Sequence, residues 1–432
     1  MAAETFGGAT VVIDLGTARG EPAEYVSPTR STMPRWLWPV AAAVLVLLAA
    51  TASAGPPRPA LTALLTIQVG PADPYAMTDD GTLLAQTQGT LASFDLADGA
   101  KLWQAGTETP TYRLTIGGGL LLLRSLTSAT RAVSLQDGSV RWRRADSVTT
   151  VAGSPTLLAV TPVKSFTSVG RRVQRAIDAV DPATGQTRWE VPVPSTAVLL
   201  GVPGPADDGA RMLLVHDDRT ATLHDLVTGE KLAAGPLPPA DYGPDNPVVS
   251  GGLILLRHPT PAGRMVSAFD PLTLQLRWTR PAGFAFEITT CGRYSCLTGP
   301  DGVRAIDPRD GTEQWFQPEW RGVDQRGSLL VAFGTPAGEN DPIGLVDPAT
   351  GKVLTGLHGW RLVGGDGGDH LLVTRPAEAG RTMVAVAAPG DAQPRILAAL
   401  PAGTADCQSA PGRLACRSTS GDLAVWAYQR KG

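Results

Sequence analysis

Short apolar runs, punctuated by glycine and aspartate, follow one another along most of this chain. Residues 111–143 show the pattern, with strand-like runs at 111–116, 120–124, 131–135 and 140–143 and turns at 117–119 and 136–138. Runs of this length between glycine and aspartate are typical of β-strands joined by hairpins. No window outside residues 36–54 keeps an apolar period of 3.6 residues. The pattern predicts an all-β protein from Leu61 onward.

One phrase recurs seven times along the chain: an apolar strand, Asp-x-x-x-Gly, three residues and then Trp. The copies that keep the Trp contain Asp95, Gly99 and Trp103; Gly138 and Trp142; Asp181, Gly185 and Trp189; Asp270 and Trp278; and Asp307, Gly311 and Trp315. Two weaker copies place Ala233 and Thr355 at the Trp position. The turn positions 99, 138, 185, 229, 274, 311 and 351 lie 37 to 47 residues apart, which indicates a repeat architecture.

Local chemistry suggests a structural role for each residue of this phrase. An Asp carboxylate can cap the turn that it begins, Gly supplies a positive φ, and a Trp ring is large enough to pack between neighbouring units. We therefore expect the repeated Asp, Gly and Trp residues to hold the fold together rather than to act in catalysis.

The repeat predicts a β-propeller of four-stranded antiparallel blades, because radial closure removes exposed sheet edges. Full units lie near 75–104, 112–144, 150–192, 198–235, 247–280, 286–318, 320–357 and 362–399. Residues 403–429 supply three more strands, and Leu64–Val69 is the candidate for their fourth. A literal count gives nine units, but propellers usually have at most eight blades. We expect eight, with seven or nine as the alternatives.

The stretches Asp181–Trp189 and Asp307–Trp315 resemble the blade repeat of the PQQ-binding-like β-propeller family. The resemblance covers most of the chain and implies the fold, with little about activity. In that family, a quinoprotein dehydrogenase needs a Ca²⁺ held by Glu, Asn and Asp, an adjacent Cys-Cys disulfide and a route for electrons such as a Cys-x-x-Cys-His haem site. This chain has neither cysteine motif, and its only asparagines are Asn246 and Asn340. We expect no cofactor, no catalytic residues and no enzyme activity.

Residues 36–54 are uncharged and would make about 28 Å of helix, close to the hydrocarbon thickness of a bilayer. Arg30 and Arg35 precede them, which favours a cytoplasmic N-terminus. A signal peptide cleaved near Ala52-Ser53-Ala54 is the alternative, although 35 residues before the apolar run is long for one. We expect a disordered cytoplasmic tail (1–35), a single-pass transmembrane anchor (36–54), a Pro-rich linker (55–60) and an extracytoplasmic propeller (61–432).

The four cysteines form two local pairs, Cys291 with Cys296 and Cys407 with Cys416, each flanking a turn between short strands. Cross-strand disulfides in an oxidising compartment explain this placement. A C-x4-C pair could also be half of a zinc site, but the five histidines show no metal-binding spacing. We expect two disulfides and no metal.

Net charge and composition bear on the kind of partner and on the source genome. The net charge of −3 gives no global field that would favour nucleic acid, so we expect no nucleic-acid partner. The dominance of Arg over Lys and the Ala/Gly/Pro-rich composition indicate a high-GC bacterial genome, as in actinobacteria.

What remains as a functional surface is the loops of a rigid scaffold. The longest insertions lie at 162–174, 203–210, 236–247, 257–265 and 334–342, and Phe284, Phe286, Trp315, Phe316 and Trp320 lie close in sequence. Most of these aromatic residues should be core, with Trp320 as a candidate anchor for a partner. We expect a membrane-tethered module that binds or scaffolds an envelope protein. A small-molecule sensor signalling through the tail, or a quinoprotein-type oxidoreductase, is the alternative.

Overall fold

The computed structural model describes residues 39, 60–107, 111–126, 129–150, 154, 156–160, 174–194, 198–202, 211–216, 220–238, 248–334, 341–365 and 368–429. The chain divides into two compact units, Met1–Arg58 and Pro59–Gly432, and all that follows concerns the second. Apart from residue 39, the predicted tail and anchor lie outside the described residues, as does most of the linker. No helix among the described residues is long and apolar enough to cross a membrane.

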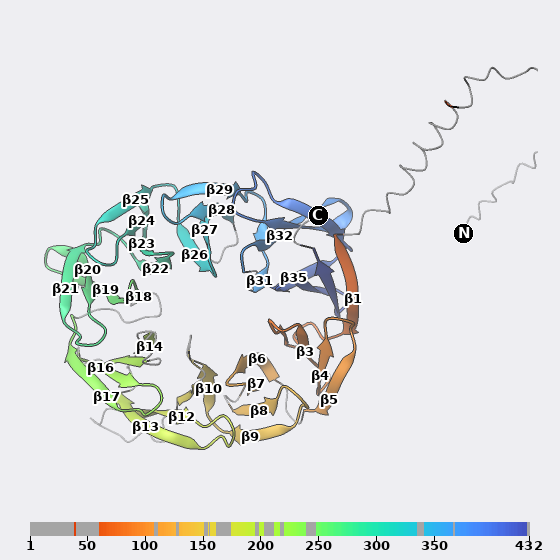
Figure 1. The fold of residues 1–432 in the computed structure, drawn as a ribbon, viewed down its shortest axis with the longest axis horizontal. Coiled ribbons are helices and arrows are strands. Elements are labelled where there is room, and N and C mark those ends of the chain that lie inside the picture. The colour runs from red at the N-terminus through yellow and green to blue at the C-terminus, as the bar shows by residue number, and fades with distance from the viewer. Residues whose placement is uncertain are drawn as a thin grey trace, which may run out of the picture. The chain divides into compact units, whose positions relative to one another are not determined.

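The described strands form a ring of nine four-stranded blades, each running from an inner to an outer strand (Figure 1). Blades 1 to 3 are β2 (Tyr75–Met77), β3 (Thr82–Thr87), β4 (Thr90–Asp95) and β5 (Lys101–Gly106); β6 (Thr111–Gly117), β7 (Leu120–Ser125), β8 (Thr130–Ser134) and β9 (Val140–Arg144); and β10 (Ser147–Thr150), β11 (Leu157–Val160), β12 (Gln174–Val180) and β13 (Thr187–Pro194). Blades 4 to 6 are β14 (Val198–Val202), β15 (Arg211–Val215), β16 (Thr220–Asp225) and β17 (Lys231–Pro236); β18 (Val248–Ser250), β19 (Leu253–Thr260), β20 (Gly263–Phe269) and β21 (Leu276–Pro281); and β22 (Glu287–Cys291), β23 (Tyr294–Gly299), β24 (Gly302–Ile306) and β25 (Glu313–Gln317).

The last three blades complete the ring. Blade 7 is β26 (Gly322–Arg326), β27 (Leu329–Phe333), β28 (Pro342–Asp347) and β29 (Lys352–Gly356); blade 8 is β30 (Arg361–Leu362), β32 (Leu371–Pro376), β33 (Thr382–Ala387) and β34 (Arg395–Leu400), with the 3-10 turn η1 (Glu378–Gly380) in its central hairpin. Blade 9 is β35 (Thr404–Ala410), β36 (Arg413–Ser418), β37 (Asp422–Tyr428) and β1 (Leu61–Gln68). The two-residue strand β31 (Gly364–Gly365) adds a parallel pairing to the inner edge of β35.

Burial follows the position of a strand within its blade. All residues of β23 and of β27, each the second strand of a blade, are buried, whereas in the outer strand β25 only Trp315 is buried. A second strand is covered on both faces by the neighbouring blades, so it holds apolar residues throughout, as in β27, or small ones such as Ser295 and Thr298 in β23. The core is therefore a series of clusters between blades rather than one central core.

The expected count of eight blades is wrong, because the structure has nine. The expectation discounted one weak unit, but the units without the Trp still form complete interfaces. In blade 4, Ala233 packs with Leu274, which replaces the turn Gly of blade 5. In blade 7, Thr355 Oγ1 donates a hydrogen bond to the Ala388 carbonyl of blade 8 (2.8 Å). Loss of the Trp therefore does not mark an incomplete blade.

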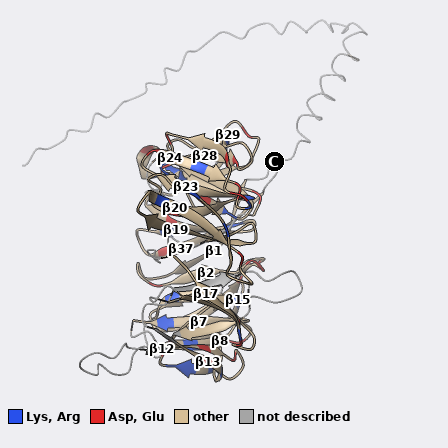
Figure 2. Ribbon diagram, turned by 90° about the vertical axis from the view of Figure 1, so that its left-hand side faces the viewer, with Lys and Arg blue, Asp and Glu red and all other residues tan. Residues whose placement is uncertain are grey.

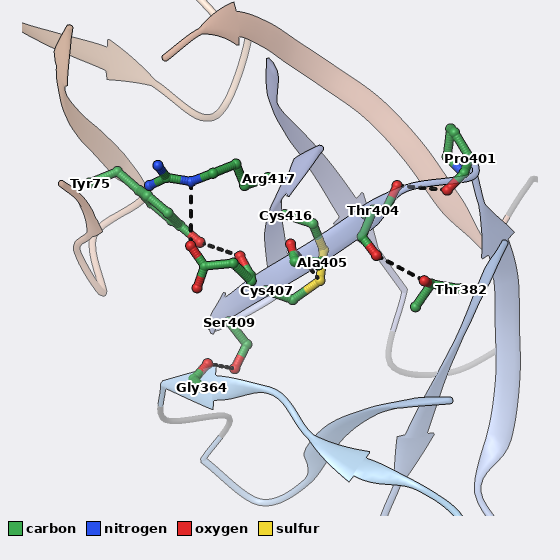
Figure 3. The surroundings of a disulfide bond; sticks show 11 residues. Tyr75, Gly364, Thr382, Pro401, Thr404, Ala405, Cys407, Ser409, Cys416 and Arg417 are labelled. Carbon is green, nitrogen blue, oxygen red and sulfur yellow. Dashed lines mark hydrogen bonds and ion pairs between the residues drawn. A yellow bond between two sulfur atoms is a disulfide. The ribbon is translucent and has the colours of Figure 1, made fainter. Parts of the chain in front are cut away.

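The two ends of the described chain meet in blade 9, where β1 pairs antiparallel with β37, as the sequence predicted for the N-terminal strand. At the seam with blade 1, Arg417 Nη2 donates to the Asp73 carbonyl (2.6 Å), and the guanidinium lies over the Tyr75 ring (5.4 Å). Arg417 also forms an ion pair with Asp406 (3.3 Å), whose carbonyl accepts the Tyr75 hydroxyl (2.7 Å; Figure 3). Burial raises the pKa of Tyr75 above its ordinary value, which keeps this donor protonated.

The meander of each blade gives the ring two different faces. The hairpins between strands 1 and 2 and between strands 3 and 4 lie on one face, which we call the turn face. The hairpins between strands 2 and 3 and the links to the next blade lie on the other, which we call the connection face. Seen edge-on, acidic and basic residues are interspersed over the ring, with no single-sign band (Figure 2).

Candidate functional site

The Asp-x-x-x-Gly turns all lie on the turn face, where their side chains stabilise the turns themselves. Asp181 Oδ1 accepts the backbone N–H groups of Ala183 (2.8 Å) and Thr184 (3.0 Å). The Arg188 side chain also donates to this carboxylate, and these bonds lower the pKa of Asp181. Equivalent carboxylate-to-backbone bonds occur in blades 1, 4, 5, 6 and 7.

Each Trp of the repeat contacts the turn of the following blade. The indole Nε1–H of Trp103 donates to the Leu135 carbonyl (2.8 Å), and a Cβ on Gly138 would lie 2.5 Å from its ring. Trp142, Trp189, Trp278 and Trp315 make the same bond to residues 182, 227, 308 and 348 of the next turn. The turn Gly thus has two reasons to be Gly, its positive φ and the ring that covers it. These residues carry no chemistry for a ligand.

Both predicted disulfides are present, Cys291–Cys296 in blade 6 and Cys407–Cys416 in blade 9. Each joins the first two strands of its blade: β22 to β23, and β35 to β36 (Figure 3). Because all four cysteines are bonded to one another, none is a thiol that could bind a metal or attack a substrate. Among the described residues, no group of three or more His, Cys, Asp or Glu side chains could hold a metal ion.

Within the described part of the chain, one surface feature that the repeat does not explain is an open groove on the connection face, between blades 5 and 6. It measures about 840 Å³ and is lined by Ala262, Gly263, Arg264, Met265, Pro281, Gly283, Phe284, Phe286 and Pro300. Arg264 is the only charged residue in this lining. Two of its aromatic side chains are open to solvent, with Phe284 74% and Phe286 43% exposed.

Small residues hold these phenylalanines outward. In the link from β21 to β22, Ala282 and Ala285 are buried and joined by a turn bond from Ala285 N–H to the Ala282 carbonyl (3.2 Å). The Phe286 N–H donates to the Thr298 carbonyl (2.9 Å). With the alanines turned inward and Gly283 at a positive φ between them, Phe284 faces solvent. The link is therefore fixed in a conformation that displays its aromatic residues.

Arginines reinforce the same link. Arg257 Nη1 (2.9 Å) and Arg264 Nη1 (3.2 Å), from two adjacent strands of blade 5, both donate to the carbonyl of Ala285. On the blade 6 side, Arg304 lies over the Phe316 ring (5.1 Å). Phe316 is 37% exposed, so aromatic surface continues past the groove onto β25.

The groove only partly matches the sequence expectations. Trp320, the expected anchor, is buried and packs edge-to-face against buried Trp315 (centroids 5.7 Å apart), so it cannot contact a partner. Of the five long insertions, only 257–265 lies fully within the described residues, and it forms the β19–β20 hairpin beside the groove. Sequence reasoning missed Arg264 and Pro281. The alternation of small and large residues in Ala282–Phe286 was the available signal.

Comparison with known proteins places the chain in a family. The family model described as outer membrane protein assembly factor BamB matches residues 67–196 and 173–317, which together span more than half of the chain. No curated protein matches the chain.

Similar solved structures include BamB from Moraxella catarrhalis (16% identity, 85% of this chain and 100% of that one, TM-score 0.42) and the computationally designed Ika8 protein (13%, 84% and 98%, 0.45). A eukaryotic initiation factor is also similar (12%, 77% and 91%, 0.51). At such identities, likeness to a solved structure speaks for the fold alone. The family match itself is sufficient, and the chain belongs to the PQQ-like propeller family of the outer membrane protein assembly factor BamB.

Proposed function

We propose that this protein is a protein-binding or scaffolding module of the cell envelope, tethered to the membrane by residues 36–54 with its propeller outside the cytoplasm. The observation that carries the binding role is the groove between blades 5 and 6, which is lined by Phe284 with 74% of its surface exposed. Exposed apolar surface of this kind marks interaction sites, and solvent-facing aromatic residues are frequent anchors of protein interfaces.

The groove is built for binding rather than for chemistry. Its lining offers one guanidinium and otherwise apolar or aromatic groups, so it contains no acid–base pair and no nucleophile. Its backbone is held by hydrogen bonds to Arg257 and Arg264, so little ordering entropy would be lost when a partner docks. A rigid apolar surface with little polar content suits a protein partner.

Three observations support the proposed location in the cell envelope. Residues 36–54 are apolar and long enough to span a bilayer, and the two disulfides suit an oxidising compartment. The family is described by an assembly factor of the outer membrane. We extend from that description only the idea of an envelope protein as the partner.

Site-specific photo-crosslinking in the native host tests the binding role. A photoreactive amino acid at position 284 should give a reproducible crosslink to one envelope protein. The matched control is position 126, because Leu126 is 83% exposed in the central hairpin of blade 2, on the same face but outside the groove. Equal crosslinking at 284 and 126, or no protein crosslinked at 284, would overturn the proposed role.

Protease accessibility of the propeller in intact spheroplasts tests the location.

A further inference from the structure

The charges around the groove are unevenly neutralised. On its blade 6 side, Arg304 forms ion pairs with Asp301 (3.5 Å) and Glu313 (2.9 Å), so the one positive charge there is already paired with two carboxylates of the protein. On its blade 5 side, Arg264 donates to the neutral carbonyl of Ala285 and forms no ion pair with any described residue. The apolar groove thus has one positive charge without a carboxylate partner among the described residues.

Arg264 is well placed to receive a ligand. It is exposed, it lines the groove together with Phe284 and Phe286, and its bond to Ala285 uses one of five N–H donors. That bond also fixes the guanidinium, so a carboxylate could be bound with little further loss of side-chain freedom. A fixed arginine beside exposed aromatic rings offers both an electrostatic and an apolar contact within one groove.

Building on the proposed protein-binding role, we propose that the groove binds an extended acidic segment of the partner protein. The segment places an aromatic or aliphatic side chain against Phe284 and Phe286, and an Asp, Glu or C-terminal carboxylate on Arg264. The pairing of opposite charges selects the partner, and the apolar contact supplies most of the affinity.

Selection from a phage-displayed library of random heptapeptides on the full-length protein tests this assignment. We expect enriched peptides to combine an apolar side chain with Asp or Glu. A synthetic copy of the best peptide should bind Phe284→Ser about 30-fold more weakly and Arg264→Glu about tenfold more weakly than the wild type. Selection on Arg264→Glu should instead enrich Lys or Arg, whereas Arg264→Lys should keep the acidic preference.

Two matched controls separate the groove from the rest of its face. Arg381 in the central hairpin of blade 8 is exposed and donates to a backbone carbonyl (Ala399, 2.9 Å), as Arg264 does. Arg381→Glu and Leu126→Ser should leave peptide binding unchanged. Both groove side chains are exposed, so their substitution should not unfold the protein, and melting curves verify this.

The outcomes distinguish the two ideas. Enriched peptides without acidic residues, or an unchanged preference in Arg264→Glu, would overturn the acidic segment, while crosslinking at position 284 would still support a protein partner. Absence of a protein crosslink at position 284 would overturn the proposed function, and the acidic segment with it.

Discussion

At the scale of single residues, the turn aspartates act locally, and the sequence predicts that action well. Asp270 Oδ1 accepts the N–H groups of Leu272 (2.9 Å) and Thr273 (3.0 Å), and the Arg277 side chain donates to Oδ2. All of these partners lie within seven residues, so turn chemistry alone predicts the capping. The Arg277 side chain and the two N–H groups lower the pKa of Asp270 to about 2.

This lowered pKa predicts a pH dependence of stability. Because the pKa of Asp270 is lower in the folded chain than its ordinary 3.8, its carboxylate stabilises the fold fully above about pH 4, and this contribution is lost as the pH falls toward 2. Asp270→Asn should therefore lower the Tm at neutral pH and lose less Tm than the wild type between pH 4 and pH 2. Thermal unfolding across this range measures the difference. Arg277→Gln, which removes the guanidinium donor, should also lose less Tm than the wild type over this range. An equal fall in Tm between pH 4 and pH 2 for all three proteins would contradict the role of the Asp270 carboxylate.

At the scale of elements, the blades are coupled by a contact that one repeat cannot reveal. The Trp of one blade covers the turn Gly of the next, and the residue opposite it on strand 3 is small: Ser93, Ala132, Ala179, Ala268 or Ala305. In blades 4 and 7, which keep the Asp-x-x-x-Gly turn but lack the Trp, that opposite residue is Leu223 or Leu345. The volume lost with the Trp is restored by its neighbours, which keeps the interface packed.

Rebuilding the Trp contact in blade 4 tests this compensation. Ala233→Trp alone should destabilise the protein, because Leu223 and Leu274 occupy the space of the ring. Adding Leu223→Ala and Leu274→Gly should recover most of the lost stability, since Leu274 already has a positive φ (55°) that Gly adopts freely. Denaturant unfolding of the single, double and triple variants gives the coupling, expected at about 0.5–3 kcal/mol. Purely additive effects would show that the three positions do not share one space.

The exposure of the aromatic side chains in the groove could not be predicted from the sequence. The sequence predicted that most of the five Phe and Trp residues from position 284 to position 320 are core, which is wrong, because three of them are exposed: Phe284, Phe286 and Phe316. Exposure of Phe284 depends on Ala282 and Ala285 fitting between two blades, while Trp320 is buried against Trp315. Both outcomes depend on packing between elements that are not adjacent in one repeat.

At the scale of the whole molecule, closure of the ring depends on contacts between the two ends of the described chain. The sequence predicted the four-stranded repeat and the role of the N-terminal strand, whereas the blade count was wrong. The literal count of sequence units was nine, and the expectation of eight came from the usual upper limit for propellers rather than from the repeats. The seam itself is held by β1 on β37 and by Arg417, which reaches from blade 9 to Asp73 and Tyr75 of blade 1.

Removal of the seam arginine should open the ring before the rest of the fold. Arg417→Gln should lower the free energy of unfolding by about 2–3 kcal/mol, because it removes charged hydrogen bonds to the partly buried carbonyls of Gly70 and Asp73. Hydrogen exchange should accelerate first at β1 and β2. The matched control is Arg188→Gln, whose exposed ion pair with Asp181 should contribute about 0–1 kcal/mol. Equal effects of the two substitutions would contradict a special role for the seam.

The pairing of β1 with β37 also sets the order of events while the chain is being made. Leu61 is synthesised long before its partner Tyr428, and at about 5–20 residues per second β1 waits roughly 20–70 s for that partner. Through that interval, its uncharged sequence, Leu61–Gln68, presents an open strand edge to any other chain. The first strand of the propeller to be synthesised is thus the last to be paired, and the nascent chain is most vulnerable to wrong pairing at this strand.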